Sequence, residues 1–240
     1  MSPNNAGSMR SLKVGGIAPF TATDYPGKLA AVIFVQGCPW RCGYCHNPHL
    51  QSRTGEGAVP WPQIMQLLER RVGLIDAVVF SGGEATTDSM LGDAIRAVRE
   101  LGFSIGLHTA GAYPNRLAAL LPLLDWVGFD IKAPFDGYHR VTSVGDSWRQ
   151  AHNSARLILA SGIPYEFRTT IHPSLLGEED ILSLAQTLQH MEVRNYALQL
   201  FRAQGCADAG LKAVSTAGYP GKALLEQIAA MFAQFTFRSA

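Results

Sequence analysis

The sequence predicts an α/β fold in which six parallel strands form an open, partial barrel behind a short N-terminal extension. Six short apolar runs are each followed by a stretch with helical spacing of its apolar residues. That alternation implies a parallel sheet with right-handed crossovers. The chain has 240 residues, whereas a closed barrel of eight strand–helix units usually needs about 250. We therefore expect an incomplete barrel.

The strand candidates are rich in Val, Ile and Phe. Their apolar residues are continuous rather than alternating, as expected of strands buried on both faces. They are residues 29–35, 77–81, 103–108, 126–131, 165–171 and 196–201. A further stretch, residues 12–27, is expected to form a leading strand or hairpin and a loop rich in Gly and Pro.

Helix candidates fill the gaps between these runs, with apolar residues three and four positions apart. They are residues 61–72, 90–101, 115–124, 148–160, 178–190 and 221–234. No low-complexity linker or break in composition divides the chain. We expect a single domain over residues 12–240, preceded by a flexible leader at residues 1–11.

Composition excludes several classes of protein. Twenty basic and nineteen acidic residues give a formal net charge of +1, which offers no broad field for nucleic acid. Charged residues make up 16% and hydrophobic ones 47%, which is too apolar for a disordered chain. The N-terminal stretch lacks an apolar signal core, and the apolar run at 29–35 is too short to span a membrane. We expect a cytoplasmic protein with no nucleic-acid or membrane partner.

Three of the four cysteines lie within eight residues, at Cys38, Cys42 and Cys45, while Cys206 stands alone. Three thiolates on one short loop can hold three corners of a 4Fe–4S cluster and leave one iron open. An alternative is structural zinc, with His46 or Cys206 as fourth ligand, although the adjacent Cys45 and His46 side chains do not readily converge on one ion. Ordinary buried thiols are a further alternative, and the inert thiol is the favoured interpretation of Cys206.

Polar residues follow or close every predicted strand, where functional groups of parallel α/β barrels gather. After the Cys loop they include residues 81–84 (Ser-Gly-Gly-Glu), 108–111 (His-Thr-Ala-Gly), Asp130, Lys132, Arg168, Gln199 and Arg202. Gly82 and Gly83 let a ligand approach the backbone, and Glu84 can accept from an ammonium group. Taken alone, that turn also suits an ordinary strand-to-helix connection with a solvated Glu.

The motif CPWRCGYC, followed some forty residues later by FSGGEAT, resembles the radical S-adenosylmethionine (SAM) enzymes. The order and spacing of all six units also resemble that superfamily. Within it, the chain resembles glycyl-radical-enzyme activases, and most of all the anaerobic ribonucleoside-triphosphate reductase activating proteins. The narrower likeness rests on residues 23–27, 44–48, 130–132 and 168–170.

The resemblance implies a reaction, two cofactors and their ligands. A 4Fe–4S cluster on Cys38, Cys42 and Cys45 would reductively cleave SAM. The resulting radical would abstract a Cα hydrogen from a glycine of a partner enzyme, anaerobic (class III) ribonucleotide reductase. The implied SAM-binding residues are Tyr44, Gly82, Gly83, Glu84, Thr109, Asp130, Lys132, Arg168 and Arg202. Asp24 and Tyr25 would form the rim that meets the partner's loop, and no catalytic residue beyond the cofactor ligands is expected.

The chain also departs from those relatives. His108 stands where related activases have an Asp that belongs to a monovalent-cation site, and a buried histidine at a strand end is the favoured interpretation. No second Cys-rich insertion is present, so the electron must come from an external donor such as flavodoxin or ferredoxin.

Two other functions remain open at this point. One is a radical SAM enzyme acting on a small molecule, of the type that forms 7-deazaguanine precursors. Those enzymes commonly carry Asp-Thr after the last Cys, where this chain has His46 and Asn47. The other is a non-catalytic iron–sulfur or zinc protein.

Overall fold

The computed structural model describes residues 11–53 and 57–239, so the leader predicted at 1–11 lies outside the described residues except for Ser11. Eight strands form one sheet whose spatial order follows the chain order, from β1 to β8. β1 pairs with β2 antiparallel, and every later pair is parallel. The strands are β1 (Val14–Thr21), β2 (Ala30–Val35), β3 (Ala77–Gly82), β4 (Ser104–Thr109), β5 (Trp126–Asp130), β6 (Tyr165–Ile171), β7 (Asn195–Leu200) and β8 (Gln234–Arg238).

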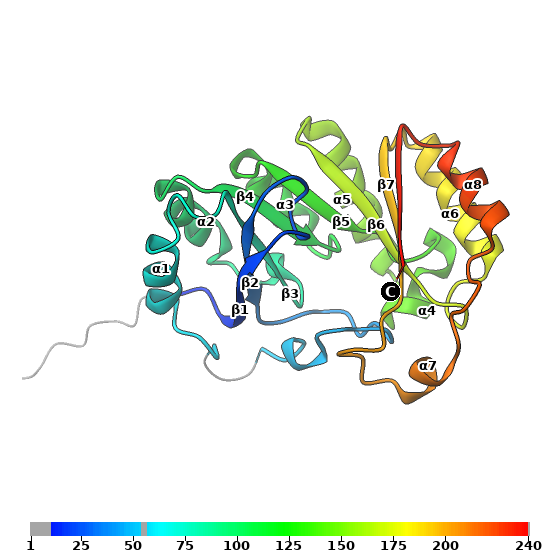
Figure 1. The fold of residues 1–240 in the computed structure, drawn as a ribbon, viewed down its shortest axis with the longest axis horizontal. Coiled ribbons are helices and arrows are strands. Elements are labelled where there is room, and N and C mark those ends of the chain that lie inside the picture. Colours follow the sequence, from blue (N-terminus) through cyan, green and yellow to red (C-terminus); the bar gives the residue numbers. More distant parts are fainter. Residues whose placement is uncertain (1–10, 54–56, 240) are drawn as a thin grey trace, which may run out of the picture.

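The predicted fold class, an open partial α/β barrel, is confirmed. The curved sheet begins at β1 and ends at β8 without joining them, and Figure 1 shows the blue and red strands at opposite ends of the curve. The six predicted strands are β2 to β7, and the predicted leading strand is β1. β8 is an addition, because residues 221–234 were expected to be helical and nothing was expected after them. The segment QFTFR is short and alternates, which is typical of a strand with one polar face.

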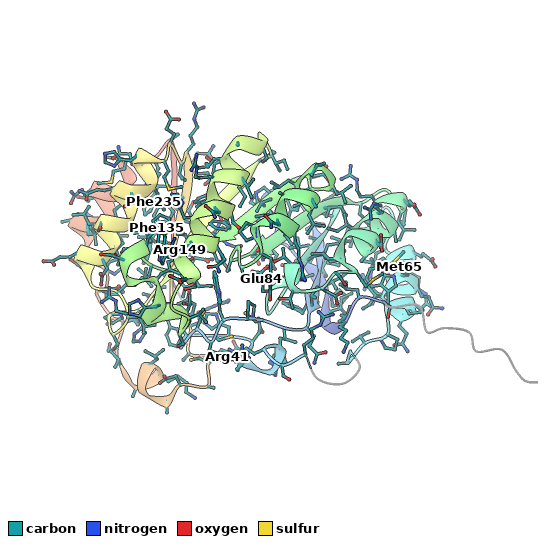
Figure 2. All side chains as sticks on the ribbon, turned by 180° about the vertical axis from the view of Figure 1, so that it is seen from behind. Arg41, Met65, Glu84, Phe135, Arg149 and Phe235 are labelled. Atoms are coloured by element: carbon teal, nitrogen blue, oxygen red, sulfur yellow. The ribbon has the colours of Figure 1, made fainter. Side chains whose placement is uncertain are left out.

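The helices follow the strands along the chain and cover the outer face of the sheet, and they lie in front of it in Figure 2. They are α1 (Trp61–Glu69), α2 (Leu91–Glu100), α3 (Pro114–Leu120), α4 (Tyr138–Thr142), α5 (Ser147–Ser161), α6 (Glu178–His190), α7 (Ala209–Ala213) and α8 (Lys222–Ala229). No helix in the described part of the chain is long and apolar enough to cross a membrane.

Two apolar clusters hold the barrel together. The larger one lies between the sheet and the helices and includes Phe80, Phe129 and Phe167, all fully buried. The smaller one lies on the inner face of β2, β3 and β5, and its buried members are Tyr25, Ala30, Val32, Ala77, Val79 and Trp126. Alternate residues of a strand point to opposite faces. The side chains between those of the larger cluster therefore line the inside of the barrel, which we call the lumen.

Strand register places polar side chains in rows across the lumen. Asp130 of β5 is opposite Arg168 of β6. Two residues further along, Thr170 of β6 is opposite Gln199 of β7, which is opposite Arg238 of β8. Because parallel strands end at the same edge, both rows lie near the carboxyl ends of the strands, beside the loop that carries the three cysteines.

Candidate functional site

The Cys loop follows β2 and is held by backbone hydrogen bonds to segments on either side. The Cys38 amide donates to the Gln51 carbonyl at 3.1 Å, and the Arg41 amide donates to the Thr142 carbonyl at 2.9 Å. The Arg41 guanidinium also donates to the carbonyls of Cys38 and Trp40, at 2.6 and 2.9 Å. The spacing of the three thiols is therefore set by the protein's own backbone.

Gly82 and Gly83 are required because two backbone segments press against them. Gly82 has φ of +127°, and a Cβ there would overlap the backbone of Val35. A Cβ on Gly83 would lie 2.5 Å from the Gly37 carbonyl oxygen. The groups that approach these glycines in the structure are backbone atoms of the chain itself, at the end of β2 and the start of the Cys loop.

Glu84 is buried, with 2% of its surface exposed, and its carboxylate is occupied within the protein. Oε1 accepts from the hydroxyls of Thr86 and Thr109, at 2.6 and 2.7 Å, and Oε2 accepts from the Ala110 amide at 2.8 Å. Through these hydrogen bonds, Glu84 connects the end of β3 to the end of β4. It is not solvated, and its side chain does not line the cavity described next.

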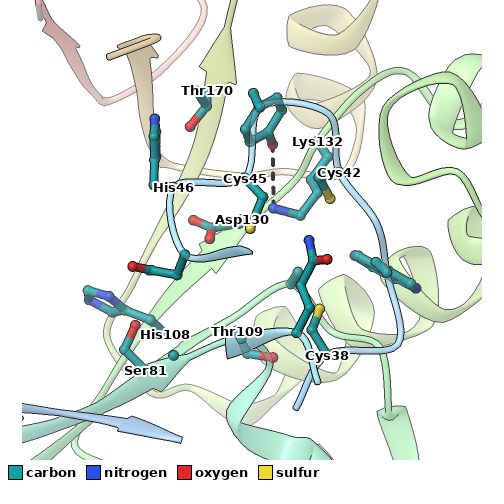
Figure 3. A pocket seen from close by; sticks show the side chains of 17 residues that line it. Cys38, Cys42, Cys45, His46, Ser81, His108, Thr109, Asp130, Lys132 and Thr170 are labelled. Carbon is teal, nitrogen blue, oxygen red and sulfur yellow. Dashed lines mark hydrogen bonds between the residues drawn. The ribbon is translucent and has the colours of Figure 1, made fainter. Parts of the chain in front are cut away.

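A cavity of about 150 Å³ lies between the Cys loop and the carboxyl ends of β3 to β6. Ten of its lining residues are labelled in Figure 3. We call it the thiol cavity, since all three clustered cysteines line it. The implied SAM residues in its wall are Tyr44, Gly82, Gly83, Thr109, Asp130 and Lys132.

The chemistry of the thiol cavity suits a cationic group bound by thiolates. Burial raises the pKa of Cys38 to about 12 and also raises that of Cys42. Thiolates at this depth therefore need a positive partner, and a cluster supplies one. No three His, Cys, Asp or Glu side chains of the described residues converge on a single metal-ion position. Zinc needs that convergence, whereas a 4Fe–4S cluster takes each thiolate on a different iron.

Lys132 and Asp130 bring opposite charges into the thiol cavity. The Lys132 ammonium donates to the Tyr44 hydroxyl at 3.4 Å, the dashed line in Figure 3, and lies 5.4 Å from the centre of that ring. Burial alone would raise the pKa of Asp130, but the Arg168 guanidinium and Lys132 outweigh it and hold the pKa below 3.8. The wall of the thiol cavity therefore carries both an ammonium group, from Lys132, and a carboxylate, from Asp130.

Arg168 reaches Asp130 from the neighbouring strand and is itself buried. Its Nε and Nη2 lie 3.0 and 2.9 Å from Asp130 Oδ1. Its Nη1 lies 3.3 Å from His108 Nε2, which is also 2.8 Å from the Asp24 carbonyl. Burial and then the Arg168 charge lower the pKa of His108 to about 4. His108 is a neutral strand-end histidine at neutral pH, and it lines the thiol cavity.

A second cavity of about 320 Å³ adjoins the first, and we call it the edge cavity. It shares His46 and Thr170 with the thiol cavity. Its other lining residues are Thr23, Asp24, Arg168, Gln199, Leu200, Arg202, Arg238 and Ser239. Arg168 and Arg202, both implied SAM residues, thus line the edge cavity and not the thiol cavity.

The two residues expected at the partner-facing rim lie in different surroundings. Asp24 lines the edge cavity, and its carboxylate accepts from the Thr21 hydroxyl at 2.6 Å. The Tyr25 side chain is not on an exposed rim: it is 6% exposed and packs on Trp126, with ring centres 5.3 Å apart. An aromatic residue between Asp and Pro in a loop is typical of the protein surface. Here the ring instead fills part of the lumen, packed against Trp126.

His46 and Cys206 connect the Cys loop to the segment that follows β7. His46 Nε2 is 3.0 Å from the Arg202 carbonyl, and its ring stacks on Phe201. Cys206 is buried, with its sulfur 3.6 Å from the Gly43 carbonyl. This agrees with the interpretation of Cys206 as an inert thiol.

Two features of the site were missed from the sequence. Thr170 lies two positions after Arg168 on β6, so the period of a strand could have placed both in the lumen. The bidentate pair between Arg238 and Glu166, with both contacts at 2.8 Å, could not be anticipated without β8.

Comparison with known proteins agrees with this geometry. Residues 32–188 match the Radical SAM superfamily. A protein of Methanocaldococcus jannaschii, whose name describes a glycyl-radical enzyme activating enzyme, is 31% identical over 207 residues, covering 83% of this chain and 84% of its own. The pyruvate formate-lyase-activating enzyme of Clostridium pasteurianum is 29% identical over 186 residues, covering 75% and 77%.

Solved structures share the fold at low identity. Streptococcus suis SuiB bound to S-adenosylmethionine superimposes with a TM-score of 0.65 at 13% identity, over 85% of this chain and 48% of that one. QueE from Escherichia coli superimposes with a TM-score of 0.53 at 17% identity, over 95% and 94%. At these identities the likeness concerns the fold alone.

Proposed function

Because this chain belongs to the radical SAM superfamily, we propose that it is an activase that installs a glycyl radical on a partner enzyme. The observation that carries the proposal is the set of three loop thiols facing Asp130 and Lys132 across one cavity. The names of the relatives in M. jannaschii and C. pasteurianum support the activase function among the possible radical SAM reactions.

The enzyme uses a 4Fe–4S cluster and SAM, as its superfamily does. Cys38, Cys42 and Cys45 would hold the cluster, and the fit rests on their common cavity and on the desolvation of the Cys38 and Cys42 thiols. When bound, the two groups together supply reductive cleavage of the SAM sulfonium and abstraction of a hydrogen atom.

The chain's own residues would position SAM and keep water out. Lys132 would meet the SAM carboxylate and Asp130 a donor group of SAM, since each keeps its charge in the cavity wall. Tyr44 would pack beside the adenine. The backbone of Gly82 and Gly83, with Thr109, would receive the methionyl end, while Glu84 holds that turn in place through its bonds to Thr109 and Ala110.

Arg168 and Arg202 would act from the edge cavity. Arg168 orients Asp130 through two hydrogen bonds to one oxygen. The Arg202 carbonyl lies 3.0 Å from His46 Nε2, which ties Arg202 to the Cys loop. Its side chain would reach ribose or carboxylate oxygens of SAM beside His46, which lines both cavities.

We propose anaerobic ribonucleotide reductase as the partner. The proposal rests on the resemblance to the activating proteins of that reductase at residues 23–27, 44–48, 130–132 and 168–170. The external electron donor would be flavodoxin or ferredoxin. Both assignments are tested together by reconstituting the protein anaerobically with iron and sulfide, reducing it with flavodoxin or ferredoxin, and adding SAM and the reductase.

The expected products are 5′-deoxyadenosine and, with the reductase present, a glycyl EPR doublet on the reductase. Absence of SAM cleavage by the reduced, fully loaded enzyme would refute the radical SAM activity. Cleavage without a doublet on the reductase, but with one on another glycyl-radical enzyme, would reassign the partner and keep the activase.

A further inference from the structure

The edge cavity contains two polar side chains that the protein leaves without partners. Thr170 and Gln199 are half-buried, face one another across β6 and β7, and have no side-chain hydrogen bond within the described residues. Other polar groups in the lumen are paired, such as Arg168 with Asp130 and Arg238 with Glu166. Both side chains line the edge cavity and are only partly buried, so their donor and acceptor groups remain open to a ligand there.

These two side chains lie on a line that connects the thiol cavity with the open edge of the barrel. Thr170 lines both cavities, Gln199 is its neighbour on β7, and Arg238 is the next neighbour on β8. β8 ends the sheet, and the loop before β2 faces it across the edge cavity through Thr23 and Asp24. A chain entering between β8 and that loop therefore reaches the thiol cavity by passing Gln199.

The chemistry of this line suits a peptide backbone. A glutamine side chain carries the same donor and acceptor groups as a peptide unit and can pair with one at both ends. Thr170 adds a hydroxyl that donates or accepts. Neighbouring strands are about 4.8 Å apart, so the line from Thr170 to Arg238 spans roughly 10 Å, about three residues of extended chain.

Resting on the proposed function, we infer that Gln199 binds the backbone of the partner's glycine-bearing segment. The segment lies extended across β6, β7 and β8, with the glycine in the thiol cavity near Thr170. A peptide unit within three residues of the glycine, on one side of it only, pairs with the Gln199 amide. Recognition at this point reads the backbone and tolerates changes of side chain in the segment.

The test measures binding of model peptides to the holoenzyme loaded with cluster and SAM. The probe is a blocked heptapeptide, alanine at every position except a central glycine, together with versions methylated at one amide nitrogen each. Fluorescence anisotropy of a labelled copy gives the Kd. Methylation of one amide on one side of the glycine is expected to weaken binding by about 2- to 12-fold, the value of one hydrogen bond.

Gln199→Ala is expected to weaken binding of the unmethylated peptide by the same factor. It should also abolish the effect of methylation at that one amide. Gln227→Ala, on the exposed face of α8, is the matched control and should change neither value. Thr170→Val is a second variant that keeps side-chain shape, and it should weaken the parent peptide while leaving the methylation effect at Gln199 intact.

The inference is overturned if the wild-type holoenzyme does not bind the peptide, or if Gln199→Ala keeps both the affinity and the methylation effect. If Gln199→Ala does not fold, a wild-type holoenzyme whose affinity is unchanged by methylation at every single amide overturns it. Failure of the wild-type enzyme to produce a glycyl doublet refutes the proposed function. A normal doublet with unchanged peptide affinity in both variants refutes only the inference about Gln199.

Discussion

The two halves of the barrel lumen are built on opposite principles. Under β2 to β5 the lumen is filled by the chain itself, because Tyr25 folds in against Val79 and Trp126. Under β5 to β8 it is lined by paired charges and remains hollow, with Arg168 as its central group. Apolar burial closes one half at no cost in desolvated charge, whereas the other half keeps polar groups that an incoming molecule can use.

Two glycines show that each half is shaped around one large side chain. A Cβ on Gly106 of β4 would lie 3.0 Å from both the Tyr25 ring and Val79. A Cβ on Gly128 of β5 would lie 2.7 Å from the Trp126 ring and 2.9 Å from the Arg168 guanidinium. The barrel therefore makes room for one aromatic ring on one side and one guanidinium on the other. The boundary is Trp126, which contacts Tyr25 and, at 5.5 Å between ring centres, His108.

The largest expected effect lies above both halves, at the loop that covers them. Cys42→Ala should abolish cluster loading and SAM cleavage, because the cluster loses one of its three thiolates. Iron content and the absorbance of the reconstituted protein measure loading, and circular dichroism measures the fold, which we expect to be retained. Cys206→Ala is the matched control, and full loading of Cys42→Ala would contradict the ligand assignment.

Tyr25→Ala tests the filled half. Removing a buried aromatic ring should lower the free energy of unfolding by about 3 kcal/mol, since the lumen cannot collapse onto the space. Urea denaturation measures it. The control is Phe20→Ala, since Phe20 lies on the edge strand β1 and is 55% exposed. It should change the free energy of unfolding by less than about 0.5 kcal/mol. Equal effects of the two substitutions would show that Tyr25 does not support the barrel.

His108 makes the boundary sensitive to acid. Its pKa is about 4 in the folded protein against 6.5 when unperturbed, so the unfolded chain binds an extra proton between these pH values and stability falls as pH drops through them. Arg168 disfavours the proton, while Asp130 and Asp24 favour it. We expect a loss of about 2 kcal/mol between pH 7 and 4.5, measured by urea denaturation.

His108→Asn should remove most of that loss, because the neutral amide does not titrate. His190→Asn, at an exposed helix end, should leave the pH dependence unchanged. An unaltered pH dependence in His108→Asn would show that His108 is protonated as easily in the folded protein as in the unfolded chain.

The smallest expected effect is in the hollow half. Glu166→Gln keeps the shape of the side chain and leaves Arg238 without its counter-charge, so we expect a loss of about 1 kcal/mol in unfolding free energy. Arg238 is not among the residues expected to contact SAM, but it lines the edge cavity, so SAM affinity should stay the same while peptide affinity changes. A large loss of SAM affinity would place β8 in the SAM site instead.

Sequence patterns predicted seven of the eight strands, β1 to β7, and the grouping of three thiols on one loop, because both depend on local spacing. The position of Tyr25 could not be predicted, because it depends on contacts with Val79 and Trp126, which lie on strands far away in the sequence. The pair of Glu166 and Arg238 was missed because β8 alternates over only five residues. Glu84 has a local signal, but its partners Thr109 and Ala110 come from another strand.

The attachments of the Cys loop have a consequence for how the metal is acquired. The loop is tied to Gln51 and Thr142 through the backbone, and to Arg202 through His46. Much of the conformational entropy of the ligands is therefore already lost when the chain folds, and binding does not have to supply it again. In a zinc finger, by contrast, the metal drives folding. Here the apoprotein should be a folded acceptor, so iron and sulfide can be delivered to it late and returned to it after damage.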